Sequence, residues 1–88
     1  MNYQKAEKIY KALANRRRLA IIQCLSKEDK ITVSDISEKI KLSLTSTSKH
    51  LQILKSAGLA ESEQVNLEQH YFLVNKNNSF IKQALSVE

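Results

Sequence analysis

The only glycine of this chain, Gly58, separates two kinds of hydrophobic pattern. Before it, in residues 43–57, apolar or small side chains recur at steps of three and four, which is the period of a helix. After it, residues 60–65 and 69–74 are short β-prone runs joined by residues 66–68. Because glycine adopts a left-handed backbone conformation without strain, Gly58 is expected to end a helix and lead into a hairpin.

The rest of the chain reads as short helices with recognisable start signals. Asn15 and Ser43 are suitable N-caps, and Thr32 followed by Asp35 resembles a capping box. A turn is expected at residues 41–42. The expected helices are residues 3–13, 16–26, 32–40, 43–57 and 79–87. The predicted fold is mainly α with a small β-hairpin, a winged helix-turn-helix forming one domain over residues 1–88.

The segment between Glu38 and Glu61 contains no carboxylate, but it has four lysines and six serines or threonines. Its expected buried stripe is Leu44, Thr47, Leu51 and Leu54. Its opposite side shows Thr45, Ser48, Lys49, Gln52 and Ser56. Short hydroxyls, one amide and one ammonium suit a helix lying in the major groove of DNA, where they reach base edges and phosphate oxygens.

The charge of the chain fits a polyanionic partner. The net charge is +5 and the pI is about 9.5. Residues 1–60 carry twelve bases and five acids, whereas residues 61–88 carry two bases and four acids. The positive field therefore belongs to the first two thirds of the chain. At 88 residues the core is small, so burying further surface in a dimer would stabilise it.

Several classes of protein are disfavoured. The single cysteine, Cys24, cannot form an internal disulfide or a multi-cysteine metal site. There is no apolar stretch long enough for a membrane span, and the polar start is no signal peptide, so a cytoplasmic protein is expected. No grouping of nucleophile, base and acid and no Gly-rich phosphate loop is present, so the chain is not expected to be an enzyme.

Two stretches, KALANRRRLAIIQCL and SDISEKIKLSLTSTSKHLQILKSAGL, resemble the ArsR/SmtB-type winged-helix repressors. The matching positions are Leu13, Asn15, Arg18, Ser43 through Ser48, His50-Leu51 and Ala57-Gly58-Leu59. The resemblance implies a homodimer joined through its first and last helices. It also implies binding to a palindromic operator in double-stranded DNA, which blocks transcription until an inducer arrives.

Many members of that family sense metals, but this chain departs from their ligand pattern. Two cysteines of the metal-binding members fall on Thr32 and Ser34, and an Asp and a His of another site fall on Asn75 and Asn77. Hydroxyls and neutral amides are poor ligands for soft metal ions or zinc. No regulatory metal and no cofactor are therefore expected, and the inducer stays unknown.

The candidate DNA-binding residues are Ser43, Leu44, Thr45, Ser46, Ser48, Lys49, Gln52, Arg16, Arg17, Lys41 and Lys55. The candidate dimer interface is Tyr3, Ala6, Tyr10, Leu13, Phe80, Ile81, Ala84 and Leu85. Arg18 is expected to pair with an acid such as Glu38 or Asp35, and His50 to hydrogen-bond within the helix-turn-helix. Lys5, Lys8 and Lys11 are expected to be solubilising residues.

Two alternatives remain open. The hairpin carries Glu61, Glu63 and Glu68 and no base, and acids there would repel DNA. The same fold would then act as a protein-interaction module that uses its acidic hairpin as the contact surface. The other alternative is a repressor switched through Cys24, although no second cysteine is present to pair with it.

Overall fold

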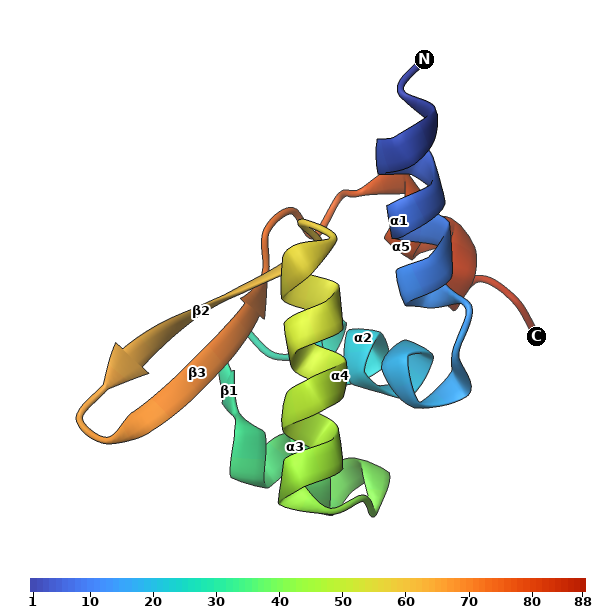
Figure 1. Cartoon of the computed structure of the whole chain (residues 1–88). Coiled ribbons are helices and arrows are strands. Elements are labelled where there is room, and N and C mark those ends of the chain that lie inside the picture. Colours follow the sequence, from blue (N-terminus) through green and yellow to red (C-terminus); the bar gives the residue numbers. More distant parts are fainter.

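The computed structural model describes all residues 1–88 and shows five helices and a three-stranded sheet (Figure 1). Helix α4 runs through the centre of the view, the β2–β3 hairpin extends away from it on one side, and α1 and α5 lie on the other. The fold is the predicted winged helix-turn-helix. The elements are α1 (Tyr3–Leu13), α2 (Arg16–Lys27), β1 (Ile31–Thr32), α3 (Val33–Ile40), α4 (Leu44–Ser56), β2 (Ala60–Val65), β3 (Glu68–Leu73) and α5 (Ser79–Leu85).

The predicted helix starts are confirmed by their side-chain caps. The side chain of Asn15 accepts hydrogen bonds from the backbone N–H groups of residues 17 and 18, and Ser43 accepts from that of residue 46. Thr32 accepts from the backbone N–H of Asp35, which is one of the two hydrogen bonds of the expected capping box. Each cap satisfies donors that the first turn of a helix leaves without partners.

Helix α4 ends in the way that Gly58 predicted. Gly58 has φ +77°, in the left-handed region. Its N–H donates to the carbonyl of Lys55, and the N–H of Leu59 donates to that of Leu54. This pair of bonds is a Schellman motif, and Leu59 packs into the core just beyond it. The glycine therefore sets the angle at which the chain leaves α4 and enters the hairpin.

The sheet contains one strand that the sequence did not reveal. Its order is β1-β3-β2, all antiparallel, with Ile31 of β1 opposite Tyr71 of β3. A strand of two residues is too short to show alternation in the sequence. The hairpin turn also differs from the expected three-residue connection. Val65 pairs with Glu68, so only two residues lie between the strands, and Asn66 takes a left-handed conformation at φ 58°.

The core is formed by fifteen apolar residues drawn from all five helices and the sheet. Helix α2 lies at its centre, because α2 packs against the other four helices and β3. Its fully buried residues Ile21, Ile22 and Leu25 meet Leu51 and Leu54 of α4 in that core. One face of α4 is therefore buried in the core, and the opposite face lies at the surface.

Three details of the predicted faces are corrected by the structure. Leu44 is 54% exposed and does not belong to the buried stripe of α4. Ile81, predicted at the dimer interface, is only 1% exposed and lies in the protomer's own core, whereas Leu13 packs in the core and also lines the depression beside α1. The last helix ends at Leu85 rather than at residue 87. None of the helices is long and apolar enough to span a membrane.

Candidate nucleic-acid interface

The exposed face of α4 forms one wall of a groove, and the tip of the hairpin with the start of α3 forms the other. The groove has a volume of about 550 Å³. From α4 it is lined by Leu44, Thr45, Ser48, Lys49 and Gln52. These five are among the eleven residues predicted to bind DNA, and the fold brings them together on one side of one helix. We call this the hairpin groove.

The other wall of the hairpin groove includes residues that the sequence did not single out for DNA binding. Thr32 and Ser34 come from the start of α3, and Leu67 and Glu68 from the hairpin tip. The pairing of β1 with β3 brings the hairpin close to the start of α3. This pairing joins segments far apart in the chain, so no local sequence pattern indicates it. Thr32, the N-cap of α3, and Ser34 are hydroxyl residues, so small polar groups line the groove from both walls.

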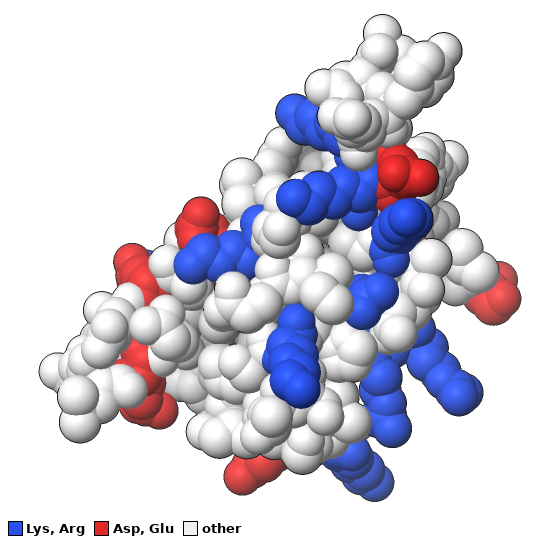
Figure 2. Space-filling view, in the orientation of Figure 1, with Lys and Arg blue, Asp and Glu red and all other residues white.

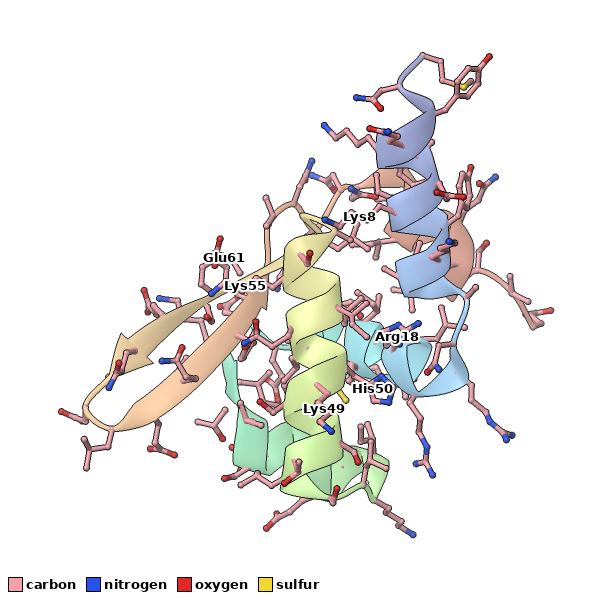
Figure 3. The ribbon with its side chains drawn as sticks, in the orientation of Figure 1. Lys8, Arg18, Lys49, His50, Lys55 and Glu61 are labelled. Atoms are coloured by element: carbon pink, nitrogen blue, oxygen red, sulfur yellow. The ribbon has the colours of Figure 1, made fainter.

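Two predicted contact residues of α4 differ in how far their polar groups are already engaged. The amide nitrogen of Gln52 donates to the hydroxyl of Tyr71 at 3.2 Å, which fixes the orientation of the amide. Lys49 is exposed and forms no ion pair, and Figure 3 shows it near the middle of α4. Its ammonium is therefore available to an anion or to a base edge.

Two of the three hairpin acids are paired with lysines from elsewhere in the fold. Lys55 of α4 lies 3.2 Å from Glu61 and 3.1 Å from the hydroxyl of Ser62. The backbone N–H of Ser62 and then the Lys55 ammonium lower the pKa of the Glu61 carboxyl. Lys30 pairs with Glu63. The hairpin is thus much less negative than its sequence indicates, and Lys55, predicted to lie near phosphate, connects α4 to β2.

Glu68 is the hairpin acid that forms no ion pair, and it lies in the hairpin groove. It is exposed at the end of β3 next to the turn. Any anion entering the groove would meet this carboxylate. Glu68 is therefore the one acid of the hairpin with a direct electrostatic effect on the groove.

The three arginines at the start of α2 have different surroundings. Arg18 donates to the carbonyls of Ala12 at 2.6 Å and Lys11 at 3.1 Å, at the end of α1. The predicted ion pair of Arg18 with Glu38 or Asp35 is therefore wrong. Carbonyls at a helix C-terminus carry partial negative charge and take the place of a carboxylate.

Arg17 has a similar structural contact, while Arg16 has none. A guanidinium nitrogen of Arg17 lies 3.0 Å from the carbonyl of Ile40, the last residue of α3. Arg16 is exposed and forms no side-chain hydrogen bond or ion pair. Of the two arginines predicted to bind DNA, Arg17 therefore has one guanidinium nitrogen bonded to the end of α3, and Arg16 is free.

His50 lies on α4 and faces Arg18, as Figure 3 shows. Its Nδ1 is 3.1 Å from a guanidinium nitrogen of Arg18. Since arginine can only donate, Nδ1 accepts and the ring is neutral. Partial burial, followed by the charges of Arg18 and Arg17, lowers the pKa of His50. His50 therefore hydrogen-bonds inside the protein, but its partner is on α2 and not within the helix-turn-helix as predicted.

The remaining predicted DNA-binding residues lie around the N-terminus of α4. Ser43 is exposed and caps the helix, and Ser46 is half-buried outside the groove. Lys41 is exposed and takes a left-handed conformation at φ 56° in the turn before α4. Figure 2 shows lysines and arginines spread over α1, α4 and the lower part of the visible face, while acids lie over the hairpin and at scattered places near the edges of this view.

The residues at the positions of the family's metal ligands do not form a metal site. No group of three or more His, Cys, Asp or Glu side chains comes together in the structure. Thr32 and Ser34 face the hairpin groove instead. Cys24 is half-buried on α2 and is the single free cysteine. The donor groups needed for zinc or a soft metal ion are therefore not assembled in this protomer.

A separate apolar depression of about 610 Å³ lies between α1, α2 and α5. Tyr10 and Phe80 meet there edge to face, with ring centroids 5.3 Å apart. Leu19, Ala84 and Val87 also line it, and Tyr10 is 61% exposed. Nearby, Tyr3 is 79% exposed, Leu85 is 38% exposed and Ala6 is half-buried. Apolar side chains thus remain uncovered on the α1–α5 side.

The chain has clear relatives. The helix-turn-helix domain family HTH_20 matches residues 13–63. The cadmium resistance regulator CadC of Listeria innocua is 36% identical over 66 residues, which cover 75% of this chain and 56% of CadC. The chain thus spans little more than half the length of that relative. The arsenical resistance operon repressor of Bacillus subtilis is 33% identical over 85 residues, which cover 97% of this chain and 78% of the repressor.

Solved structures of similar proteins have the same fold as this chain. The homodimeric winged helix-turn-helix domain of Mb0332 from Mycobacterium bovis, described as a possible ArsR-family regulator, has a TM-score of 0.83 at 30% identity. The match covers 94% of this chain and 74% of that domain. HlyU of Vibrio cholerae, named a transcriptional activator, has a TM-score of 0.81 at 30% identity, covering 93% of this chain and 89% of HlyU.

Proposed function

This chain belongs to the ArsR/SmtB family of winged-helix, DNA-binding transcriptional regulators, and we propose that it is a homodimeric repressor that reads a palindromic operator through α4. The observation that supports this reading is the exposed face of α4. Leu44, Thr45, Ser48, Lys49 and Gln52 lie together there, with no acid on the helix. Two such helices in a two-fold dimer would read half-sites about one helical turn apart.

The DNA contacts that we propose for each residue of α4 follow from the chemistry of its side chain. Lys49 and Gln52 reach base edges, and the hydroxyls of Thr45 and Ser48 donate to bases or phosphates. The backbone N–H groups at the start of α4 favour a phosphate near Ser43. Leu44, which is exposed, is suited to contact a thymine methyl group.

The proposed dimer uses the apolar depression between α1 and α5. A second copy would cover the exposed rings of Tyr3 and Tyr10 and the half-exposed side of Phe80. The homodimeric state of the Mycobacterium bovis domain supports this arrangement. Sedimentation at micromolar concentration is expected to give a dimer, and Tyr10→Glu is expected to give a monomer because it places charge in an apolar interface.

The experiment that tests DNA reading begins with selection of bound sequences from a random duplex pool. We expect a palindrome whose half-sites are about one helical turn apart. Lys49→Ala should then weaken binding by about 1–3 kcal/mol if Lys49 contacts a base. The matched control, Lys27→Ala, removes an exposed lysine at the end of α2, outside the hairpin groove, and should have a much smaller effect. No binding to any duplex at low salt would contradict the proposal.

The direction of regulation needs its own measurement, because one relative is named a repressor and another an activator. We expect a reporter carrying the selected site across its promoter to fall when the protein is present. A rise in the reporter would instead make this protein an activator.

The two alternatives predict other results. The interaction-module alternative requires an acidic hairpin surface, but Lys55 and Lys30 already pair with two of its acids. It would be favoured by the absence of DNA binding at low salt. A thiol switch requires Cys24, so loss of redox sensitivity of DNA binding in a Cys24→Ser variant would favour that mechanism.

A further inference from the structure

A second depression of about 500 Å³ lies between α4 and α1. We call it the α1 cleft. Its lining includes Lys8, Lys11 and Arg18, together with the amide of Gln52 and the hydroxyl of Ser56. No carboxylate lines it. Figure 3 shows Lys8 of α1 beside the C-terminal end of α4, and Arg18 of α2 beside the middle of α4.

The positive charge of the α1 cleft is only slightly compensated. Lys8 is exposed and forms no ion pair. Lys11 pairs with Glu7 at 3.8 Å, but both side chains are highly exposed, so this pair is weak. Arg18 keeps its full charge, because its partners are two carbonyls and neutral His50. Three cationic side chains therefore line the α1 cleft, together with the neutral polar groups of Gln52 and Ser56.

The position of the α1 cleft relative to the hairpin groove indicates what could enter it. Gln52 lines both depressions, so α4 stands as a ridge with the hairpin groove on one flank and the α1 cleft on the other. A helix in the major groove has a sugar–phosphate strand along each of its two flanks. On the hairpin flank the protein offers hydroxyls, Lys49 and Glu68, so one cation there is opposed by one acid, whereas the α1 flank offers three cations and no acid.

We propose that the α1 cleft binds the phosphate backbone of the DNA strand that runs along the α1 side of α4, with Lys8 and Lys11 as the phosphate-binding residues. This inference rests on the proposed DNA-binding function and deepens it. It gives a role to two lysines that were expected only to be solubilising. Arg18 contributes charge to the cleft, but its hydrogen bonds give it a structural role as well.

The proposal has a clear electrostatic consequence. Binding of phosphates releases counterions and makes affinity depend on salt, whereas base contacts select sequence. Because Glu68 opposes the single lysine of the hairpin flank, Lys49, whereas no acid lines the α1 cleft, the larger part of the salt dependence of binding should come from the α1 flank. Removal of a lysine there should weaken binding to all duplexes alike.

The test compares Lys8→Gln with the control Lys27→Gln, which removes the same charge from an exposed lysine outside both depressions. Neither lysine forms an ion pair, so both variants should fold. Affinity for a mixed-sequence duplex and for a selected operator is measured over a range of salt concentrations. In Lys8→Gln the slope of log affinity against log salt should become shallower by about 1 for each phosphate that the variant no longer binds. Both duplexes should lose affinity by the same factor.

A second measurement identifies the phosphates themselves. Neutral methylphosphonate linkages are placed in the operator between the two half-sites, where the α1 sides of a dimer would face the DNA. They should weaken binding of the wild-type protein. They should weaken binding of Lys8→Gln much less, because glutamine at this position carries no charge to pair with those phosphates. Equal weakening of both proteins would overturn the assignment of Lys8.

The outcomes separate this proposal from the proposed function. If the wild type binds and Lys49→Ala weakens it, but Lys8→Gln keeps the wild-type salt slope, the α1 cleft proposal is wrong and DNA reading by α4 stands. An equally shallow slope in Lys27→Gln would also overturn it, since the effect would be one of net charge. If the wild type binds no duplex at low salt, both proposals are wrong.

Discussion

Arg18 joins the end of α1 to the middle of α4 through His50. One guanidinium nitrogen lies 3.1 Å from Nδ1 of His50, and two others donate to the carbonyls of Lys11 and Ala12. A single planar side chain therefore links the helix expected to form the dimer with the helix expected to read DNA. The family arginine thus acts as a cross-link between helices rather than as one half of an ion pair.

Replacing Arg18 by Lys should destabilise the fold by about 2 kcal/mol, because a single ammonium cannot reach the three acceptors that the guanidinium fork reaches. Urea unfolding monitored by circular dichroism measures the effect. Arg16→Lys is the matched control, since Arg16 is exposed and forms no side-chain hydrogen bond. Equal stability of the two variants would show that the Arg18 hydrogen bonds contribute little.

His50 should make the fold sensitive to acid. Burial and the nearby arginines lower its pKa in the folded protein below the ordinary value of 6.5. Below pH 6.5 the unfolded chain therefore binds a proton at His50 more readily than the folded protein does. The stability that neutral His50 contributes is fully present above pH 6.5 and is lost as pH falls toward the lowered pKa.

The measurement is the free energy of unfolding at pH 7 and at pH 5, for the wild type and for His50→Gln. Glutamine keeps an acceptor for Arg18 but does not titrate. The wild type should lose more stability than the variant over this interval. An identical pH dependence in both proteins would remove His50 from the effect.

Thr47→Val should stabilise the protein by about 1 kcal/mol. The hydroxyl of Thr47 is fully buried and has no hydrogen-bond partner, which is unfavourable in an apolar core. Valine has nearly the same shape and removes the polar atom. Thermal unfolding compares this variant with Thr45→Val on the exposed face of α4, where little change is expected. A loss of stability in Thr47→Val would indicate that the hydroxyl has an acceptor in solution.

Gly58→Ala should destabilise the fold by about 1–2 kcal/mol, because φ at this position is +77° and a β-carbon disfavours that conformation. No atom lies within 4 Å of the added carbon, so the loss would come from the backbone alone. Asparagine tolerates the left-handed region better than alanine. Gly58→Asn should therefore lose less stability in the same urea titration, and the reverse order would contradict backbone strain as the cause.

Glu68→Gln should raise DNA affinity by about two- to fivefold, which corresponds to about 0.4–1 kcal/mol. The change removes the unpaired carboxylate of the hairpin groove. Glu88→Gln, at the end of the chain and outside the groove, removes the same charge and should have less effect. The affinity ratio is measured at low salt, where exposed charges act most strongly. Unchanged affinity in Glu68→Gln would place the hairpin tip away from DNA.

The helices and the hairpin were predictable because their signals are local. A cap such as Ser43 acts on the backbone only three residues ahead, and the single glycine determines where α4 ends. The periodicity of α4 also showed which face would be free, apart from its first residue, Leu44. The cluster of candidate DNA contacts follows from that face, since neighbouring positions on one helix stay together in any tertiary arrangement.

The sequence alone therefore determined the order of the five helices and the hairpin, the winged helix-turn-helix and the polar face of α4, because caps, turns and periodicity act over a few residues. Only the tertiary structure decided the partners of charged side chains that are far apart in sequence. Arg18 hydrogen-bonds to carbonyls at the end of α1 and to His50, and Lys55 and Lys30 form ion pairs with hairpin acids. The α1 cleft likewise exists only after α1 packs beside α4. Such partners are set by packing of the core, which brings distant segments together and which no local pattern records.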